Sequence, residues 1–254
     1  DITGYSSLGA HEVSAYGTIA DSFLTRALIR ALKTTARENP EFRKEAATSI
    51  ALLRNPKSVK EALGSPQRAE WIEAIRQELQ SLVDKGVYET KPAPKDRKPI
   101  PTRLVLKIKL NADGTIDKFK ARCVVAGYRQ QAGLDYDPEG CYSPMTEAST
   151  IRLLLSLANS LNLEIDHLDI KTAFLNGVLP EKERFWCSPP PGAPEEFLPP
   201  PGHAWHMAKG LYGAHQSGAI WSKTWRAWMK EHASEFHEAG TERCVYVMRQ
   251  DAQG

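Results

Sequence analysis

The sequence predicts an α+β fold, in which helices and β-hairpins occupy separate stretches of the chain. Apolar residues recur at helical spacing in several segments, whereas residues 102–110 (TRLVLKIKL) alternate between apolar and polar side chains. The predicted elements do not follow a βαβ rhythm, which argues against a parallel α/β sheet. With 254 residues, 41% of them hydrophobic and 25% charged, the chain suits one large globular domain or two small ones.

Composition argues against several protein classes. The chain has no run of about 18 apolar residues and no secretory pattern at its start, so neither a membrane span nor secretion is expected. Its cysteines form no C-x-x-C pair, which predicts reduced thiols in a cytosolic or nuclear protein: Cys123, Cys141, Cys187 and Cys244. His203 and His206 lack a third candidate ligand, so a metal site is not expected there.

The first third of the chain is predicted to be largely helical. Residues 1–20 are rich in Gly, Ser and Ala and read as a linker, and helical spacing follows over 21–38 and 41–54. A longer helix should begin at Ser65-Pro66, because Ser is a good N-cap and Pro suits the first helical position. It should end at Lys85-Gly86. Its predicted apolar face consists of Trp71, Ile72, Ile75, Leu79, Leu82 and Val83.

A basic β-hairpin is predicted next. Residues 102–110 and 115–126 form the strands, joined by turn residues 111–114. The apolar face holds Leu104, Leu106, Ile108 and Leu110, and the polar face holds Arg103, Lys107, Lys109, Lys120 and Arg122. Between Lys91 and Arg129 there are eleven positive and three negative side chains. This excess suits a phosphate backbone, but a solvated strand surface explains it equally well.

The second half of the chain mixes helices and strands. We expect a helix over 149–161 capped by Ser149 or Thr150, a strand over 163–170, and a short helix ending at Gly177. Prolines exclude regular structure from residues 188–202. A helix over 219–236 and a strand over 244–248 follow, and residues 251–254 read as a turn.

The most informative segment is residues 167–177 (HLDIKTAFLNG). It resembles the first catalytic motif of copia-type retrotransposon reverse transcriptases. The resemblance implies that Asp169 is catalytic and binds two Mg²⁺ ions, that the Ile170 carbonyl binds one of them, and that Phe174 faces the sugar of the incoming nucleotide. The carboxylate chemistry suits hard cations that activate a primer hydroxyl. The structural alternatives are a turn-capping role for Asp169 and core packing for Phe174.

Two further segments resemble the same family. Residues 118–130 (KFKARCVVAGYRQ) resemble its fingers motif, which implies that Lys120 and Arg122 hold the triphosphate, and arginine suits bidentate contact with phosphate oxygens. Residues 209–221 (KGLYGAHQSGAIW) resemble the segment that supports template and nucleotide, which implies such roles for Tyr212, Gly213 and Gln216. Lys107 and Lys109 are expected to contact nucleic acid. The second match departs from the family pattern at Ala214-His215 and Ser217-Gly218.

The resemblance, which runs from about Lys57 to Met248, implies the fingers and a partial palm of a right-hand polymerase. We expect a linker or helical extension over 1–56, a fingers-like region with the basic hairpin over 57–145, and the partial palm over 146–254. Expected partners are an RNA template, a DNA primer, a deoxynucleoside triphosphate, and the integrase and ribonuclease H regions of a polyprotein. The implied location is a cytoplasmic virus-like particle, or the nucleus.

The family's second catalytic motif, Tyr-Val-Asp-Asp, is absent. After Asp169 the only aspartate is Asp251, so the chain is expected to stop before the second catalytic hairpin and to be inactive alone. The alternatives are a degenerate, non-catalytic remnant that at most binds nucleic acid, and a helical scaffold that uses residues 21–54.

Overall fold

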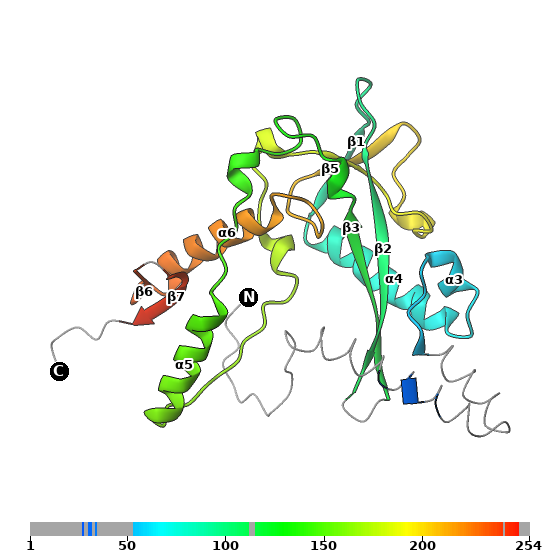
Figure 1. Cartoon of the computed structure of the whole chain (residues 1–254). Helices are drawn as coiled ribbons and strands as arrows, with labels where there is room; N and C mark the ends of the chain where they lie inside the picture. The colour runs from blue at the N-terminus through cyan, green and yellow to red at the C-terminus, as the bar shows by residue number, and fades with distance from the viewer. Residues whose placement is uncertain are drawn as a thin grey trace. The chain divides into compact units, whose positions relative to one another are not determined.

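The computed structural model describes residues 27, 30, 31, 34, 53–111, 115–240 and 242–248. Figure 1 labels its helices and strands. The chain divides into two compact units. The first comprises Asp1–Asn55, Ile108–Lys118 and Ile165–Ile170, and the second comprises Pro56–Lys107, Phe119–Glu164 and Lys171–Gly254. Most of the predicted helices 21–38 and 41–54, and the turn 251–254, lie outside the described residues. The described residues 27, 30, 31, 34 and 53 are helical.

The predicted α+β class is confirmed. A mixed five-stranded sheet has the order β1-β5-β4-β2-β3, and a two-stranded sheet pairs β6 with β7. The strands are β1 (Tyr88–Pro92), β2 (Ile100–Leu110), β3 (Ile116–Val125), β4 (Trp186–Ser188), β5 (His203–Met207), β6 (Phe236–Ala239) and β7 (Glu242–Met248). The helices are α3 (Val59–Leu63), α4 (Arg68–Asp84), α5 (Ala148–Ser160) and α6 (Ser217–His232).

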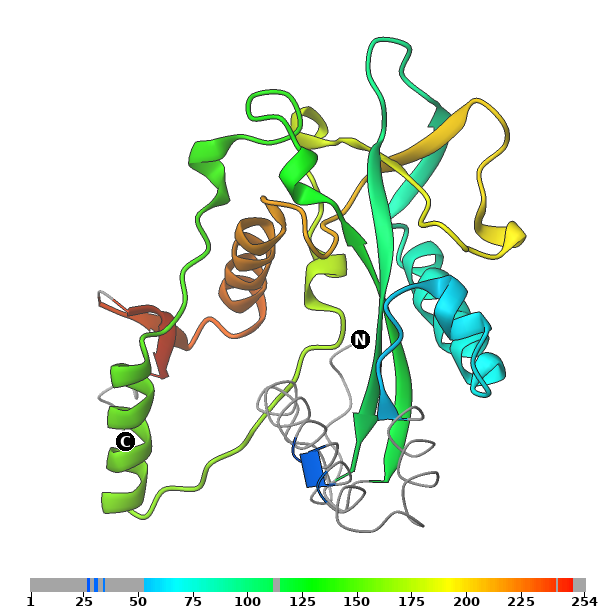
Figure 2. The same cartoon turned by 45° about the vertical axis from the view of Figure 1, so that its right-hand side comes forward.

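The predicted basic hairpin is confirmed as β2 and β3. The two strands lie side by side, and the chain reverses between them, where the Asn111 amide donates to the Thr115 carbonyl at 2.9 Å (Figure 2). The predicted apolar face of β2 is buried, whereas Arg103 is exposed and Lys107 and Lys109 are half-buried. Alternating burial continues on β3, where Ala121, Cys123 and Val125 face the core. This alternation leaves Lys120 and Arg122 on the opposite face of β3.

Helix α4 packs against β3. Its buried residues are Trp71, Ala74, Ile75, Leu79 and Leu82, and the Trp71 ring meets the Phe119 ring edge-on with centroids 4.8 Å apart. The helix ends as predicted, because Gly86 has a φ of +58° and the Val87 amide closes the turn on the Leu82 carbonyl. Its predicted start is wrong, however. The Ser65 hydroxyl donates to the Ala62 carbonyl at the end of α3, so α4 begins only at Arg68.

Short strands complete the sheet across a large separation in sequence. β1 pairs antiparallel with β5, β5 pairs antiparallel with β4, and β4 pairs in parallel with β2 through Ile100 and Cys187. The side chains that β4, β5 and the residue before β4 contribute to the core are fully buried: Phe185, Cys187, Trp205 and Met207. Between β4 and β5, the regular structure in residues 189–202 is limited to one short 3₁₀ helix, η5 (Glu195–Phe197). The prediction of irregular structure over 188–202 is therefore confirmed, except for η5 and for Ser188, which is the last residue of β4.

The predicted strand over 163–170 is wrong. Residues 163–170 adopt no regular structure, and their apolar side chains Leu163, Ile165, Leu168 and Ile170 are exposed. An extended segment becomes a strand only when a neighbour takes up its backbone N–H and C=O groups. Among the described residues, none pairs with this segment. The apolar pattern therefore predicted an extended segment correctly, but it could not show whether a neighbouring strand is present to pair with that segment.

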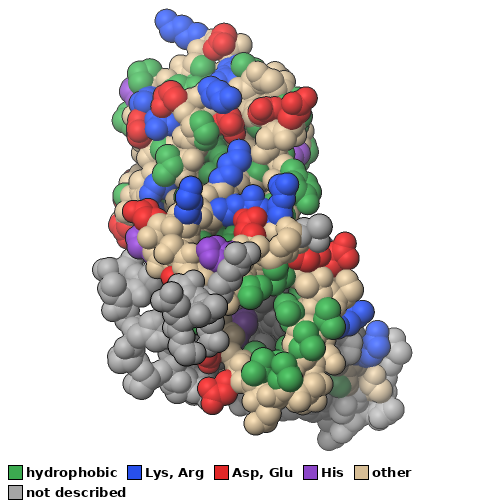
Figure 3. Space-filling view, turned by 90° about the vertical axis from the view of Figure 1, so that its left-hand side faces the viewer, with side chains coloured by type: hydrophobic (Ala, Val, Ile, Leu, Met, Phe, Trp, Pro, Cys, Tyr) green, Lys and Arg blue, Asp and Glu red, His purple; other side chains and the backbone are tan. Residues whose placement is uncertain are grey.

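Helix α5 forms within one residue of its predicted bounds, although its cap is Glu147 rather than Ser149 or Thr150. None of its residues is buried in the described part of the chain, and six large apolar side chains between Ile151 and Leu161 are exposed. Figure 3 shows hydrophobic side chains exposed in the lower part of the face that carries α5. The predicted short helix ending at Gly177 is the 3₁₀ helix η3 (Ala173–Asn176). The predicted 219–236 helix forms as α6, but it ends at His232, and Phe236 is the first residue of β6. The predicted 244–248 strand is β7.

Candidate functional site

The end of β3 and the loop that follows Lys209 are in direct backbone contact. The Val125 amide donates to the Tyr212 carbonyl at 2.8 Å. A Cβ on Gly127 would lie 2.0 Å from the Gly213 carbonyl oxygen, and a Cβ on Gly213 would lie 2.4 Å from the Val125 carbonyl oxygen. Gly213 also has a φ of +87°, which side chains disfavour. Glycine at both positions is therefore what allows these two segments of the second unit to meet.

This contact assembles three predicted site residues from three segments of the second unit. The Arg122 guanidinium carbon lies 5.6 Å from the centre of the Tyr212 ring, within cation–π range. The Phe174 ring lies on the same tyrosine, with centroids 5.5 Å apart and planes tilted by 58°. All three side chains are half-buried, so each keeps a surface that a ligand can reach. We call Arg122, Phe174 and Tyr212 the aromatic-arginine cluster.

The 3₁₀ helix η3 brings Phe174 to this cluster. Its end is fixed by the Gly177 amide, which donates to the Phe174 carbonyl at 3.2 Å, and by the Gly210 amide, which donates to the Gly177 carbonyl at 2.8 Å. A Cβ on Gly210 would lie 2.9 Å from the Phe174 carbonyl oxygen, so the two segments pack closely here as well. The segments of the first and third sequence motifs are thus hydrogen-bonded to one another.

Gln216 belongs to a buried amide network. Its side chain is 1% exposed, accepts a hydrogen bond from the Gln130 amide at 3.0 Å and donates to the Asp135 carbonyl at 2.9 Å. Gln130 in turn accepts from the His215 backbone amide at 2.8 Å. The two glutamines therefore connect the loop after β3 to the start of α6, which supports the turn that carries Tyr212. Periodicity gave no signal for this pairing, because both residues lie outside strands.

Asp135 adds a buried charge to the same network. Its carboxylate accepts from Arg97 at 3.0 Å and from the Gln131 amide at 2.8 Å, and its side chain is 7% exposed. The Tyr136 ring stacks on the His215 imidazole with centroids 4.6 Å apart. A buried, fully paired network of this kind favours a single arrangement of the loops that it joins.

Asp169 and Ile170 lie in the first unit, and the structure gives no relation between them and the aromatic-arginine cluster. Asp169 is exposed, and the Ile170 side chain is 38% exposed. Within the described ranges, no group of three or more His, Cys, Asp or Glu side chains is arranged to hold a metal ion. Lys109 also belongs to the first unit, whereas Lys107 and Lys120 belong to the second.

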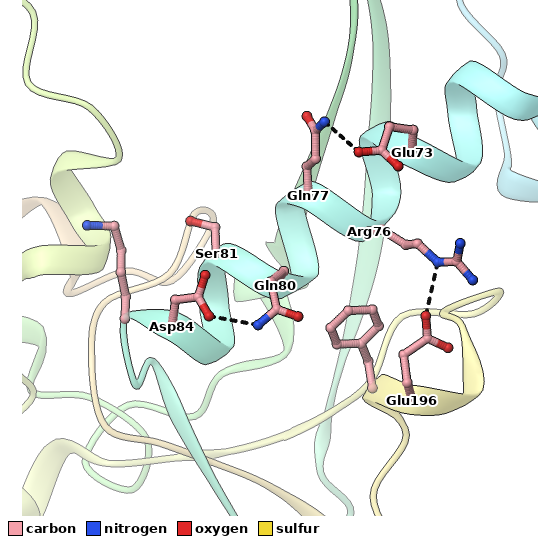
Figure 4. Close-up of a pocket in the computed structure, with 9 residues that line it drawn as sticks. Glu73, Arg76, Gln77, Gln80, Ser81, Asp84 and Glu196 are labelled. Carbon is pink, nitrogen blue, oxygen red and sulfur yellow. Dashed lines mark hydrogen bonds and ion pairs between the residues drawn. The ribbon is translucent and has the colours of Figure 1, made fainter.

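A polar groove runs along the exposed side of α4 (Figure 4). Its side chains are paired with one another: Gln77 with Glu73 and Gln80 with Asp84, each at 2.7 Å, and Arg76 with Glu196 at 3.0 Å. These six side chains are thus engaged already, and the aromatic-arginine cluster is the stronger candidate. None of the described helices is long and apolar enough to cross a bilayer.

Comparison with known proteins gives a consistent result. A family model described as reverse transcriptase (RNA-dependent DNA polymerase) matches residues 85–253. The chain is 33% identical over 221 residues to the retrovirus-related Pol polyprotein from transposon TNT 1-94 of Nicotiana tabacum, covering 86% of this chain and 16% of that protein. It is 29% identical over 183 residues and 30% identical over 193 residues to the Pol polyproteins from transposons RE2 and RE1 of Arabidopsis thaliana, covering 72% and 76% of this chain.

The chain spans 12% of the length of each of these two Arabidopsis proteins. No solved structure shows significant similarity to it. The matched region includes all three sequence motifs and every residue of the aromatic-arginine cluster. The chain therefore belongs to the reverse transcriptase (RNA-dependent DNA polymerase) family, as a region of the copia-type retrotransposon Pol polyproteins.

Proposed function

We propose that the chain is the nucleotide-binding part of an RNA-directed DNA polymerase, made of its fingers and part of its palm. The observation that carries this proposal is the aromatic-arginine cluster, in which residues from three separate motifs meet within one unit. A cation beside two aromatic rings suits a deoxynucleoside triphosphate, which combines an anionic tail with a flat base.

Each residue of the site has a distinct role in this proposal. Arg122 and Lys120 bind the triphosphate oxygens, and arginine does so through paired N–H groups. Tyr212 and the exposed backbone of Gly213 support the nucleotide. The Phe174 ring lies on the sugar and excludes a 2′-hydroxyl by steric contact, which selects deoxynucleotides. The proposed role of Gln216 in nucleic-acid binding is indirect, because its amide is occupied by Gln130 and Asp135.

Two Mg²⁺ ions are proposed for the complete enzyme, with Asp169 and the Ile170 carbonyl as ligands. When bound, the ions would lower the pKa of the primer hydroxyl and neutralise the phosphates. The described residues fit this site only in part, since one exposed carboxylate and one carbonyl fall short of the oxygen ligands that Mg²⁺ requires. We therefore propose that this chain alone does not extend a primer.

Nucleic acid is proposed to lie along the basic hairpin. Lys107 and Lys109 lie on the polar face of β2, and Lys and Arg side chains gather on one face of the molecule (Figure 3). The proposed ligands are an RNA template and a DNA primer, and the proposed neighbours are integrase and ribonuclease H regions of a polyprotein in a virus-like particle. Binding through lysines to phosphates should weaken steeply with salt.

The test is calorimetric titration of the full chain with dGTP and GTP in Mg²⁺ buffer. We expect dGTP to bind more tightly than GTP, Arg122→Ala to weaken both, and Phe174→Ala to remove the preference. Arg76→Ala serves as the matched control, because Arg76 is an exposed arginine of the same unit that forms its ion pair with Glu196. If dGTP does not bind, or if it binds equally well to Arg122→Ala, the proposal is wrong. If the chain binds a primer–template but does not bind dGTP, the alternative of a non-catalytic remnant is favoured.

A further inference from the structure

Glu78 is a half-buried carboxylate on the side of α4 that faces the basic strand β3. Its Oε1 accepts a hydrogen bond from the Cys123 backbone amide at 2.8 Å. Burial raises the pKa of Glu78 above its usual value, and this effect outweighs the opposing effects of the Cys123 amide, Arg122 and Lys120. Glu78 is therefore coupled to the two cations that the proposed function assigns to the triphosphate.

The hydrogen bond to Glu78 lies on the outer edge of the sheet. β3 is the last strand in the sheet order, so its outward-facing amides have no strand partner within the described sheet. Two of these amides are taken up by other groups: Cys123 donates to Glu78, and Val125 donates to the Tyr212 carbonyl. Arg122 is adjacent to Cys123 in the chain, so the Glu78 carboxylate and the Tyr212 loop together fix the segment that presents Arg122.

We infer that Glu78 is a positioning residue of the nucleotide site, which holds the β3 edge so that Arg122 faces Tyr212 and which takes up a proton when phosphate binds Arg122 and Lys120. The inference rests on the proposed function. It extends that function by assigning to the site a residue that does not touch the ligand and a coupling between nucleotide binding and pH.

The proton uptake follows from electrostatics. In the free chain, Arg122 and Lys120 stabilise the Glu78 carboxylate. A phosphate bound to the same cations brings negative charge close to the carboxylate, so the neutral acid becomes more favourable. The proton comes from solvent: the Glu78 carboxylate and one proton combine to form the neutral carboxylic acid. Among the described residues, the Cys123 thiol also lies against Glu78, and burial raises the pKa of this thiol to about 12, so it stays neutral below pH 9.

Linkage gives the sign of the pH effect. If binding is accompanied by proton uptake, affinity increases as pH falls through the range in which Glu78 titrates. Each unit by which bound phosphate raises the pKa of Glu78 corresponds to a gain of up to about tenfold in affinity. The nucleotide phosphates also titrate, so the effect of Glu78 is measured as the difference between the wild-type chain and a variant that lacks the carboxylate.

The experiment measures Kd of the full chain for dGTP, and separately for inorganic tripolyphosphate, from pH 5 to pH 8. Glu78→Gln keeps an oxygen that can accept from the Cys123 amide but removes the charge. We expect its affinity to rise less than that of wild type on acidification, by threefold to tenfold (an order-of-magnitude expectation from linkage). Glu73→Gln is the matched control, because Glu73 is an exposed glutamate of the same helix that bonds to Gln77 (Figure 4).

A second variant tests the positioning role. Glu78→Leu removes both the charge and the acceptor, so we expect faster exchange of the Cys123 amide hydrogen, a readout that needs no nucleotide. Compared with Glu78→Gln, which lacks the charge but keeps an acceptor, we expect weaker binding by about threefold to tenfold, the loss that accompanies a hydrogen bond. Amide exchange of Leu79 and Leu82 reports whether α4 remains folded. Should Glu78→Leu not fold, the pH dependence of Glu78→Gln decides alone.

The outcomes separate the two proposals. Absence of dGTP and tripolyphosphate binding by the wild-type chain overturns both the proposed function and this inference. If Arg122→Ala weakens binding while Glu78→Gln and Glu73→Gln show the same pH dependence as wild type, the proposed function stands and the inference is overturned. A loss of pH dependence in Glu78→Gln alone supports the inference.

Discussion

Replacing Gly213 by alanine tests whether the contact between β3 and the Tyr212 loop holds the site together. Two costs add at this position. Gly213 has a left-handed backbone conformation, and a residue with a side chain in that conformation lowers the free energy of unfolding by about 1–2 kcal/mol. The new Cβ would also lie 2.4 Å from the Val125 carbonyl oxygen, so the loop must move away and the hydrogen bond from Val125 to Tyr212 is lost. Leaving such a group unpaired costs about 1–3 kcal/mol.

Gly133→Ala is the matched control. Gly133 has a φ of +77°, but a Cβ there would have no neighbour within 4 Å, so only the backbone cost of about 1–2 kcal/mol applies. We expect Gly213→Ala to be less stable than Gly133→Ala by about 1–3 kcal/mol. In urea unfolding followed by circular dichroism, with a slope of about 2 kcal/mol per molar urea, the midpoints should differ by roughly 0.5–1.5 M. Equal midpoints for the two variants would refute the close contact.

Three other predictions concern the core of the second unit. Trp71→Ala should lower the free energy of unfolding by about 3–5 kcal/mol, because this indole is 1% exposed, whereas Val83→Ala on the same helix should change it by less than about 0.5 kcal/mol. Burial raises the pKa of Tyr88 to about 12, so its stabilising contribution is complete below pH 10 and is lost as pH rises toward 12. Absorbance at 295 nm should show a late-ionising component in the native chain, to which Tyr246 also contributes because burial raises its pKa, and Tyr88→Phe should reduce that component. Of the four thiols, two should react with Ellman's reagent in the native chain, Cys141 and Cys244, and two only after unfolding, Cys123 and Cys187. Rapid reaction of all four would contradict the burial of the last two.

The strongly periodic elements were predictable from sequence because their patterns report burial directly. The alternation of β2 matches its buried face, and the apolar stripe of α4 matches its contact with β3, except that Val83 is 47% exposed. The strands β1, β4, β5 and β6 were missed, since they are only three to five residues long. In addition, β1, β4 and β5 acquire their partners only through pairing across a long stretch of sequence. Short strands of this kind carry too few residues for a period to emerge.

The region around Asp169 illustrates the opposite limit. Its apolar residues suggested a buried strand, yet they are exposed, and the apolar face of α5 next to it in sequence is exposed too. Sequence pattern specifies which side of a segment prefers to be buried, but not whether the described chain supplies the surface that covers it. For the site, family resemblance named Arg122, Phe174 and Tyr212, but only coordinates reveal that glycine contacts bring them together.

The most direct test of the account is photo-crosslinking with a deoxynucleoside triphosphate that carries an azido group on its base, followed by mass spectrometry of the labelled peptides. We expect the label to map to residues around Tyr212 and Phe174, to be displaced by unmodified nucleotide, and to be lost in Arg122→Ala. Labelling that persists in Arg122→Ala, or that maps to the polar groove along α4, would contradict the assignment of the aromatic-arginine cluster as the nucleotide site.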